Sequence, residues 1–290
     1  MQKEIAVVTG AAGFIGTHLC RALKQENFDV RSVDIKTDVD ILDTDKLRQL
    51  FSDAKFIFHA AALPRVQHSI ERPQETHRPN VEGTLSVLVA AKDAGVARVV
   101  YSASSSAYGD QDQMPLHEDM IASPKSPYGL QKYIGELYCR LFSEVYGLST
   151  VSLRYFNVYG PGASSEGAYA LVTAKFIQQR LDGTFLTITG DGTQTRDFTH
   201  VNDVVRANLL AARSARVGRG EVINIGSGCN TSVNRIAELI GGPVQYIASR
   251  LEPHDTLADN SRAKQLLSWE PTVALEEGIA ELKRLHELDY

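Results

Sequence analysis

The chain has 290 residues, of which 43% are hydrophobic and 22% charged, and these ordinary globular values exclude disorder or a collagen-like repeat as its main state. The formal net charge of −5 gives no basic balance for binding nucleic acid or an anionic membrane. Three widely spaced cysteines without a CxxC pair, and histidines without metal-ligand spacing, predict neither disulfides nor a metal site. No apolar run reaches the roughly 18 residues of a membrane helix, and a strand-like run begins at once, so we expect a cytoplasmic protein without a signal peptide.

The first half of the chain alternates short β-branched runs with helical patterns. Strands are predicted at residues 5–9, 28–34, 56–60, 96–102, 150–155 and 222–225, with helices between them, notably 81–94 and 127–146. Such alternation is typical of right-handed crossovers and of a parallel sheet covered on both faces. The fold class that we predict is α/β, with a Rossmann-type doubly wound parallel sheet.

The second half of the chain is less regular. After Gly160-Pro161-Gly162 the pattern predicts a helix over 169–180, a strand over 185–189, a turn over 190–192 and a helix near 203–212. We interpret part of this half as a smaller C-terminal α/β substrate-binding lobe made from two separated segments. The predicted domains are 1–160 plus about 201–228 for the sheet domain, and about 161–200 plus 229–290 for the lobe.

A glycine-rich segment separates the first predicted strand from the helix that follows. Gly10, Gly13 and Gly16 stand where backbone must approach a pyrophosphate and where a helix N-terminus can meet its charge. Asp34 ends the next strand about 20 residues on, where an acid binds a ribose 2′-hydroxyl and repels a 2′-phosphate. This pattern predicts a dinucleotide site that prefers NAD to NADP, a preference that Lys36 weakens. The alternative is a helix-capping turn with a surface aspartate.

Tyr128 and Lys132 lie four residues apart in the predicted helix 127–146. Side chains at this spacing share one helix face, so the phenol and the ammonium can face one cleft. A cation close to a tyrosine favours the phenolate and lowers its pKa, which makes the tyrosine a usable base near neutral pH. In isolation, the same pattern is more often a surface tyrosine beside a lysine.

A serine-rich segment from Ser102 to Gly109 directly follows the fourth predicted strand. Loops at the carboxyl ends of parallel strands line the ligand crevice, so small hydroxyls there can bond a substrate oxygen. A serine-rich turn that caps a helix is an equally weighted alternative.

Together these motifs resemble the extended short-chain dehydrogenase/reductase superfamily, and within it the nucleotide-sugar epimerases of the UDP-galactose 4-epimerase type. The likeness covers essentially the whole chain. Further matching segments stand in family order and at family-like spacing at 59–62, 80–84, 154–161, 190–198, 258–259 and 269–271.

The resemblance implies catalytic roles for Ser104, Tyr128 and Lys132, with Tyr128 as the base. It implies NAD as the cofactor, held by Gly10, Gly13, Phe14, Ile15, Gly16, Asp34, Asp40, Ile41, Ala60, Ala61, Ala62, Asn80, Tyr128, Lys132 and Tyr155. For a UDP-sugar or another nucleotide-diphosphate sugar as substrate, it implies contacts from Ser104, Ser105, Asn157, Arg196, Arg250 and Thr256. The small Thr256 implies room for an N-acetyl group on the sugar. Two features depart from the family: Gln131 stands where Ser or Thr is usual, and the segment 162–175 is short.

The implied reaction is epimerization at C4 of a UDP-hexose or UDP-N-acetylhexosamine by transient oxidation to a 4-keto sugar. Dehydratases of the same scaffold carry Asp-Glu where this chain has Ser105 and Ser106, so the serine segment favours an epimerase. A UDP-hexuronate 4-epimerase stays open because Arg65 could meet a sugar carboxylate. Another NAD-dependent nucleotide-sugar enzyme, a dehydratase or reductase, and a non-catalytic NAD-binding protein stay open as well.

Two predicted helices carry more apolar positions than the sheet needs. These positions are Leu85, Leu88 and Val89 in one helix, and Ile134, Leu137, Leu141 and Val145 in the other. Two such helices from each subunit can form an isologous four-helix interface, as in dimers of this superfamily, so we expect a homodimer. The alternative is that both stripes belong to the core of one chain.

Overall fold

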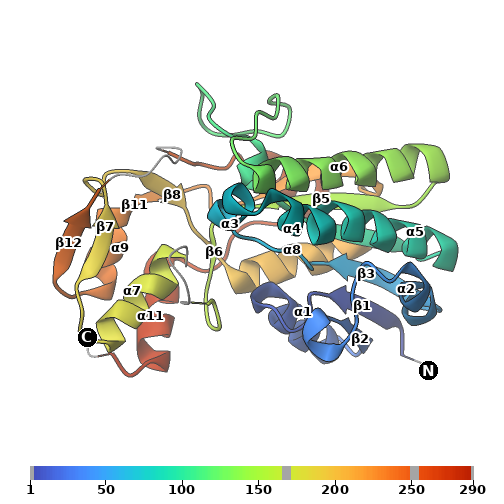
Figure 1. The fold of residues 1–290 in the computed structure, drawn as a ribbon, viewed down its shortest axis with the longest axis horizontal. Coiled ribbons are helices and arrows are strands. Elements are labelled where there is room, and N and C mark those ends of the chain that lie inside the picture. Colours follow the sequence, from blue (N-terminus) through green and yellow to red (C-terminus); the bar gives the residue numbers. More distant parts are fainter. Residues whose placement is uncertain (1–2, 165–170, 249–254, 289–290) are drawn as a thin grey trace.

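The computed structural model describes residues 3–164, 171–248 and 255–288. A large lobe carries a six-stranded sheet, and a smaller lobe of short elements lies at one end of it (Figure 1). Within the described residues no helix is long and apolar enough to cross a membrane. No group of three potential metal ligands is found in the same part of the chain.

The large sheet is entirely parallel, with the strand order β10-β5-β4-β3-β1-β2. Its strands are β1 (Ile5–Thr9), β2 (Asp29–Val33), β3 (Ala54–His59), β4 (Arg98–Ser104), β5 (Thr150–Tyr155) and β10 (Arg219–Ile225). This confirms the predicted doubly wound fold. The fourth strand begins and ends two residues later than predicted, because Ser104 still pairs with Tyr155 of β5. Ser104 is therefore held by the sheet itself and does not lie in a loop.

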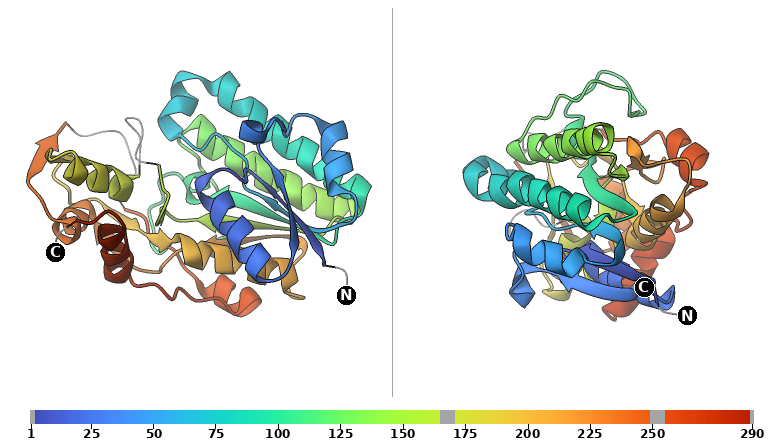
Figure 2. Two further views of the ribbon diagram at one scale, coloured as in Figure 1. Left: turned by 90° about the horizontal axis from the view of Figure 1, so that it is seen from below. Right: turned by 90° about the vertical axis from the view of Figure 1, so that its right-hand side faces the viewer.

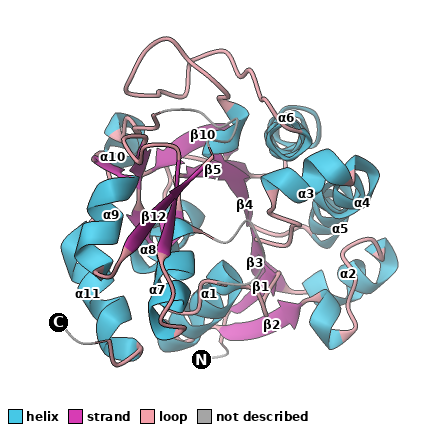
Figure 3. Cartoon of the chain, turned by 60° about the vertical axis from the view of Figure 1, so that its left-hand side comes forward, coloured by secondary structure: helices cyan, strands magenta, loops and turns pink. Residues whose placement is uncertain are grey.

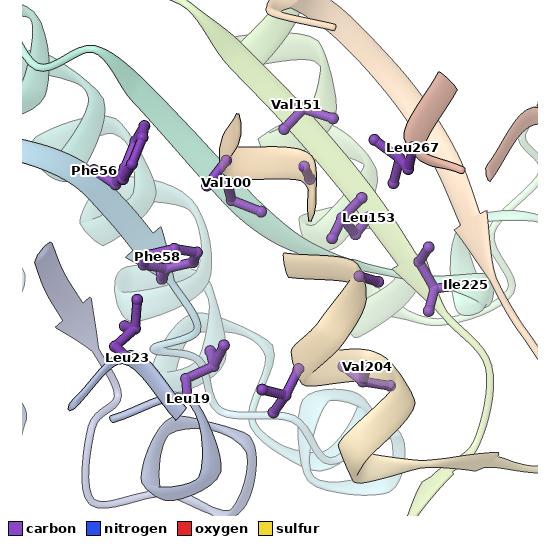
Figure 4. Close-up of a cluster of buried hydrophobic side chains, with 14 of the residues drawn as sticks. Leu19, Leu23, Phe56, Phe58, Val100, Val151, Leu153, Val204, Ile225 and Leu267 are labelled. Carbon is purple, nitrogen blue, oxygen red and sulfur yellow. The ribbon is translucent and has the colours of Figure 1, made fainter. Parts of the chain in front are cut away.

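Helices cover both faces of this sheet (Figure 2). One face carries α1 (Phe14–Gln25), α8 (Val201–Arg213) and α10 (Ser261–Leu267), and the other carries α2 (Thr44–Phe51), α5 (Thr84–Ala94) and α6 (Pro127–Tyr146). Successive residues of a strand point to opposite faces, so Val7 joins one hydrophobic cluster and Val8 joins the other. Figure 4 shows the cluster of Val8, in which Leu19 and Leu23 of α1 pack near Phe58.

The connection from β3 to α5 is more elaborate than predicted. It contains α3 (Val66–Glu71), α4 (Pro73–His77) and a π-helical turn, η2 (Arg78–Gly83). The predicted helix 81–94 therefore begins as an α-helix only at Thr84. Pro79 lies inside the continuous helical run of α4, η2 and α5, where its missing N–H removes one α-helical hydrogen bond and disfavours regular α-helical geometry. Two 3₁₀ turns complete this half, η1 (Ile35–Thr37) and η3 (Ser105–Ala107).

The small lobe is built from short strands and three helices around its own hydrophobic cluster (Figure 3). Its helices are α7 (Val172–Leu181), α9 (Val233–Ile240) and α11 (Leu275–Leu285), and its strands are β7 (Leu186–Thr189), β8 (Thr195–Asp197), β11 (Asn230–Ser232) and β12 (Val244–Ile247). Strand β11 pairs with β8 antiparallel, and β12 pairs with β7 in parallel. A two-residue pair, β6 (Val158–Tyr159) with β9 (Thr199–His200), connects the lobes. The first residues of the helix predicted at 169–180 lie outside the described residues.

Helix α10 packs on the large sheet and not in the small lobe. Leu267 and Trp269 belong to the cluster around β5 and α8, and the Trp269 indole N–H donates to the Asp203 carbonyl oxygen at 2.9 Å. We therefore propose that residues 261–269 belong to the large lobe, although the sequence pattern assigns them to the small one.

The two apolar helix stripes differ in burial. Leu88 of α5 is completely buried in the core, so its expected place in a subunit interface is wrong. The sequence cannot make this distinction, because a helix that faces a sheet and a helix that faces a partner have the same apolar periodicity. Leu137, Leu141 and Val145 of α6 are exposed.

Candidate active site

A cavity of about 1790 Å³ opens at the carboxyl ends of β1, β3, β4 and β5, and it extends to the small lobe. Strand order reverses between β1 and β3, and such switch points are where open parallel sheets bind ligands. The cavity brings together most of the residues that the sequence singles out. Among its lining residues are Gly10, Gly13, Phe14, Ile15, Gly16, Asp34, Asp40, Ile41, Ala60, Ala61, Ala62, Ser104, Ser105, Tyr128, Tyr155, Asn157, Arg196 and Thr256.

The glycine-rich loop between β1 and α1 requires glycine at two positions. Gly10 has a φ of 70°, and a Cβ there would lie 2.7 Å from the backbone nitrogen of Ala61. A Cβ on Gly16 would lie 2.0 Å from the Gly10 carbonyl oxygen. The loop therefore packs backbone against backbone at the start of α1, where unpaired N–H groups favour an anion. This cradle fits the pyrophosphate of a dinucleotide.

Asp34 follows β2 and is buried at the edge of the cavity. Its carboxylate accepts the backbone N–H groups of Ala12 and Lys36, each at 2.9 Å. These two bonds fix the carboxylate beside the glycine-rich loop, where it suits a ribose hydroxyl. Lys36 contributes its backbone N–H to this arrangement.

Asn80, which is expected to bind the cofactor, does not line the cavity, and its carboxamide is bonded to the backbone of Leu63. Its Oδ1 accepts the N–H of Leu63 at 2.8 Å, and its Nδ2 donates to the Leu63 carbonyl oxygen at 3.1 Å. Asn80 is buried behind the loop that follows β3 and holds that loop in place. The reason is geometric: the π-helical turn directs the carboxamide at the backbone of this loop.

Ser104 and Tyr128 meet in the cavity, as the sequence predicts. Ser104 is the last residue of β4, Tyr128 lies in the first turn of α6, and both residues line the cavity. Ser104 also donates to the Ser106 hydroxyl at 3.1 Å and accepts the Ser106 N–H at 3.2 Å. Ser126 caps α6 by accepting the Gly129 N–H at 3.1 Å, which fixes the start of the helix.

Lys132 differs from the prediction. Its Nζ donates to the Ser102 carbonyl oxygen at 2.7 Å and lies 5.0 Å from the centre of the Tyr101 ring, and the residue does not line the cavity. Burial lowers the pKa of Lys132 to about 8. Burial raises the pKa of Tyr128, and the nearby Ser104 hydroxyl opposes that rise. The expected lowering of the Tyr128 pKa by Lys132 is therefore not present in this geometry, because the ammonium is directed at a carbonyl group.

Tyr155 lies on the floor of the cavity at the end of β5. Its hydroxyl forms a hydrogen bond with the Ser102 hydroxyl at 3.2 Å and accepts one from Nδ2 of Asn208 at 2.8 Å. Burial raises the pKa of Tyr155 to about 12, so this phenol stays neutral near neutral pH.

The opposite side of the cavity carries the residues expected to bind substrate. Asn157 donates from Nδ2 to the Asp197 carbonyl oxygen at 2.9 Å and to the Thr256 hydroxyl at 3.4 Å. Arg196 lies in β8 and donates to the Thr195 carbonyl oxygen at 2.9 Å. Arg250 lies outside the described residues.

Asp197 is a structural residue that the sequence analysis does not single out. Its buried carboxylate accepts the N–H groups of Ser227, Gly228 and Ala258 at 2.6, 3.0 and 3.1 Å. Burial raises the pKa of Asp197, and the hydrogen bonds from Ser227 oppose that rise. Asp197 thus connects β8 with the loop after β10 and with Ala258. Its sequence signals are its place directly after Arg196 and within the family-like segment 190–198.

Lys125, Val66 and Gln194 also line the cavity without having been predicted. Lys125 directly precedes Ser126, which caps the helix that carries Tyr128, so its place in the sequence could have predicted a position at the cavity. Val66 and Gln194 carry no comparable signal, because only the folded chain places them on the cavity.

A family model described as the NAD dependent epimerase/dehydratase family matches residues 6–226. A putative UDP-glucose 4-epimerase of Methanocaldococcus jannaschii is 34% identical over 94% of this chain and 95% of its own length. A UDP-N-acetylglucosamine 4-epimerase from Methanobrevibacter ruminantium, solved with UDP-N-acetylmuramic acid, has a TM-score of 0.92 at 34% identity and 98% coverage of both chains. A UDP-glucuronic acid 4-epimerase from Bacillus cereus, solved with UDP-glucuronic acid and NAD, has a TM-score of 0.86 at 34% identity, over 97% of this chain and 99% of its own. The chain therefore belongs to the NAD-dependent epimerase/dehydratase family.

Proposed function

We propose that this protein is an NAD-dependent 4-epimerase of a UDP-hexose or UDP-N-acetylhexosamine. One observation carries the proposal: Ser104 and Tyr128 line the same cavity as the glycine-rich loop and Asp34. A base and a hydroxyl beside a dinucleotide cradle suit the oxidation of an alcohol. The epimerases among the relatives support the same activity.

In this proposal Tyr128 removes the proton from a sugar hydroxyl, and Ser104 holds the same oxygen by a hydrogen bond. NAD, which the glycine-rich loop and Asp34 would hold, would supply the hydride chemistry at the sugar carbon. Ser105 and Ser106 follow Ser104 on the cavity side and carry no carboxylate. Elimination of water needs further proton transfers that these two hydroxyls are not suited to make, so the site favours epimerization over dehydration.

Arg196 and Asn157 are proposed to hold the diphosphate of the substrate. The sugar has to turn between the two hydride transfers, so the anchor has to act on another part of the molecule. A guanidinium group can bind phosphate oxygens through forked, charge-assisted hydrogen bonds. Arg196 lies in β8 of the small lobe and lines the cavity.

A UDP-hexuronate is the second candidate substrate. Arg65 is the last residue of the loop that follows β3 and lines the cavity, where a cationic group could meet a sugar carboxylate. A relative that acts on UDP-glucuronic acid supports this alternative. The two candidates share the chemistry of Tyr128, and the hexuronate is distinguished by its carboxylate at C6 of the sugar.

The test is to incubate the purified protein with UDP-glucose, UDP-N-acetylglucosamine or UDP-glucuronate and to follow C4 epimers by NMR. We expect turnover of the first two without added NAD, because epimerization returns the hydride and the cofactor need not leave. Turnover of UDP-glucuronate alone would favour the second candidate. The absence of any epimer would contradict the proposed function, and strict dependence on added NADP would contradict the role of Asp34.

We also propose that the protein is a homodimer through α6. Leu130, Leu137, Leu141 and Val145 are each 46–60% exposed, and their spacing places them along one side of this helix. Helix α6 lies on the outer side of the large lobe (Figure 1). Two copies that pack these stripes together would give the isologous contact typical of dimers. Light scattering at micromolar concentration should give the mass of a dimer, and a monomer mass would reject it.

A further inference from the structure

Gln131 is a buried polar residue of the catalytic helix that the proposed chemistry does not use. It lies in α6 three residues after Tyr128 and directly before Lys132, and only 3% of it is exposed. A buried carboxamide is costly unless its polar atoms are paired, so its partners show what it does. These partners all belong to the segment that connects β3 with α5.

The Gln131 carboxamide is paired at both ends. Its Oε1 accepts the Nδ2 group of Asn80 at 2.8 Å. Its Nε2 donates to the Thr76 hydroxyl at 3.0 Å and to the Pro73 carbonyl oxygen at 3.3 Å. One side chain of α6 therefore holds both α4 and the π-helical turn η2.

The network continues from Asn80 to the cavity. Residues Ala60–Arg65, here called the cofactor loop, all line the cavity beside the glycine-rich loop. The Asn80 carboxamide holds this loop through both backbone groups of Leu63. Two consecutive side-chain contacts therefore join the cofactor loop to the helix that carries Tyr128.

A second contact joins the same two parts of the molecule. The Ser69 hydroxyl of α3 accepts the backbone N–H of Tyr128 at 3.0 Å. It donates to the Val66 carbonyl oxygen at 2.5 Å, so its orientation is fixed. The N–H of Tyr128 is in the first turn of α6 and has no partner within the helix, so Ser69 satisfies a donor that would otherwise be buried unpaired.

We infer that Gln131 is a positioning residue that sets the distance between the cofactor loop and the Tyr128 phenol. The inference rests on the proposed function. Hydride transfer requires the reacting groups at close, fixed distance, and a displacement of about 1 Å can cost about a hundredfold in rate. Without the Gln131 carboxamide, Asn80 and Thr76 would each lose a hydrogen-bond partner. The buried network would then no longer hold a single geometry. Gln131 therefore acts on the chemical step through Asn80 and makes no contact with the substrate itself.

The test replaces Gln131 with Met, which has a similar shape and no amide, and with Glu, which keeps the acceptor for Asn80. Turnover is measured per mole of tightly bound NAD, so that molecules without cofactor or without a fold do not count. We expect Gln131→Met to lower this turnover about tenfold, with KM within about threefold of wild type. Gln131→Glu should retain more turnover than Gln131→Met. If the Met variant does not fold, the Glu variant is compared with the wild type in its place.

Ile223→Val is the matched control, because it removes one buried methylene on the opposite face of the sheet and lowers stability without touching α6. Its turnover per bound NAD should equal that of wild type. Wild-type turnover per bound NAD in Gln131→Met would overturn the inference, and so would a Gln131→Glu value as low as that of the Met variant. A wild-type protein that epimerizes no UDP-sugar would instead contradict the proposed function.

Discussion

The cavity has two walls that differ in how they are held. The cofactor wall consists of the glycine-rich loop, the cofactor loop, Ser104 and Tyr128, all at the ends of long parallel strands or in the 20-residue helix α6. The lobe wall carries Thr187, Gln194, Arg196 and Phe198, in and around strands of three or four residues. On the cofactor wall the polar side chains are mostly buried and bonded within the chain, whereas on the lobe wall they are only partly buried.

This difference separates chemistry from recognition. Groups that must meet within a few tenths of an ångström are best held by a packed sheet and a long helix. Groups that choose a substrate can sit on short elements, which vary without disturbing the core. Asp197 connects the lobe wall to the large sheet, since it belongs to β8 and binds the loop after β10. Substitutions on the cofactor wall should therefore change turnover, and substitutions on the lobe wall should change the apparent affinity.

Tyr128→Phe is the strongest test of the cofactor wall. We expect turnover per bound NAD to fall at least about a hundredfold, the low end for loss of a general base. The phenyl ring still fills the space beside Ser104, so the NAD content and the unfolding temperature should stay close to those of wild type. An NMR assay of epimer formation measures the rate. Near-normal turnover would remove Tyr128 from its catalytic role.

Arg196→Ala tests the lobe wall. Loss of a hydrogen-bonded charge costs about 1.5–3 kcal/mol, so KM should rise from about tenfold to a hundredfold. We expect kcat to change by less than about threefold, because Arg196 is proposed to bind the diphosphate equally before and during the reaction. Arg196→Lys is the matched variant, which keeps the charge and loses the forked geometry. Its KM should lie between that of the wild type and that of Arg196→Ala. If kcat in Arg196→Ala fell by the same factor as KM rose, the lobe wall would not act on affinity alone, and the proposed division between the two walls would be wrong.

His59→Gln tests how firmly the cofactor wall depends on buried neutral groups. His59 bonds the hydroxyls of Thr9 at 2.7 Å and Thr84 at 3.0 Å, and burial, with Lys132 nearby, lowers its pKa to about 3. The unfolded chain binds a proton at His59 below pH 6.5 and the folded chain does not, so the stability that this group provides is complete above pH 6.5. It is lost as the pH falls toward 3, by at most about 1.4 kcal/mol per pH unit.

Between pH 6.5 and 5, the wild type should therefore lose about 2 kcal/mol more unfolding free energy than the Gln variant, which cannot take up this proton. Urea unfolding at several pH values measures the difference. Parallel pH profiles for the two proteins would show that His59 does not stay neutral in the fold.

The cofactor wall was the more predictable of the two. The bounds of β1, β5 and α6 match the expectation because their apolar patterns are strong and because Ser126-Pro127 and Gly147 mark the ends of α6. The glycine-rich loop and Asp34 each directly follow a strand, so a short sequence motif is enough to predict where they lie. The cavity accordingly contains nearly every residue implied for the cofactor.

What the sequence did not predict is side-chain direction. Asn80 and Lys132 are expected to bind the cofactor, and the structure shows that each also donates a hydrogen bond to a backbone carbonyl group. Gln131 was noted only as a departure from the family, because its partners lie more than fifty residues away in the chain. Leu88 was assigned to an interface because burial against a sheet and burial against a partner look alike in one sequence.

The smallest expected effect concerns Thr256, where the lobe wall meets the cofactor wall. Its hydroxyl accepts the Asp197 N–H at 3.3 Å, and the residue lines the cavity together with Ser104 and Leu116. Thr256→Tyr should exclude a bulky C2 substituent, because overfilling a pocket costs at least about 1 kcal/mol. We expect kcat/KM for UDP-N-acetylglucosamine, relative to UDP-glucose, to fall by about tenfold. Thr256→Ser, which keeps the hydroxyl and adds no bulk, is the control and should leave the ratio unchanged. The steric role of Thr256 would be disproved if wild type already rejects UDP-N-acetylglucosamine, or if the tyrosine leaves the ratio of the two substrates as it was.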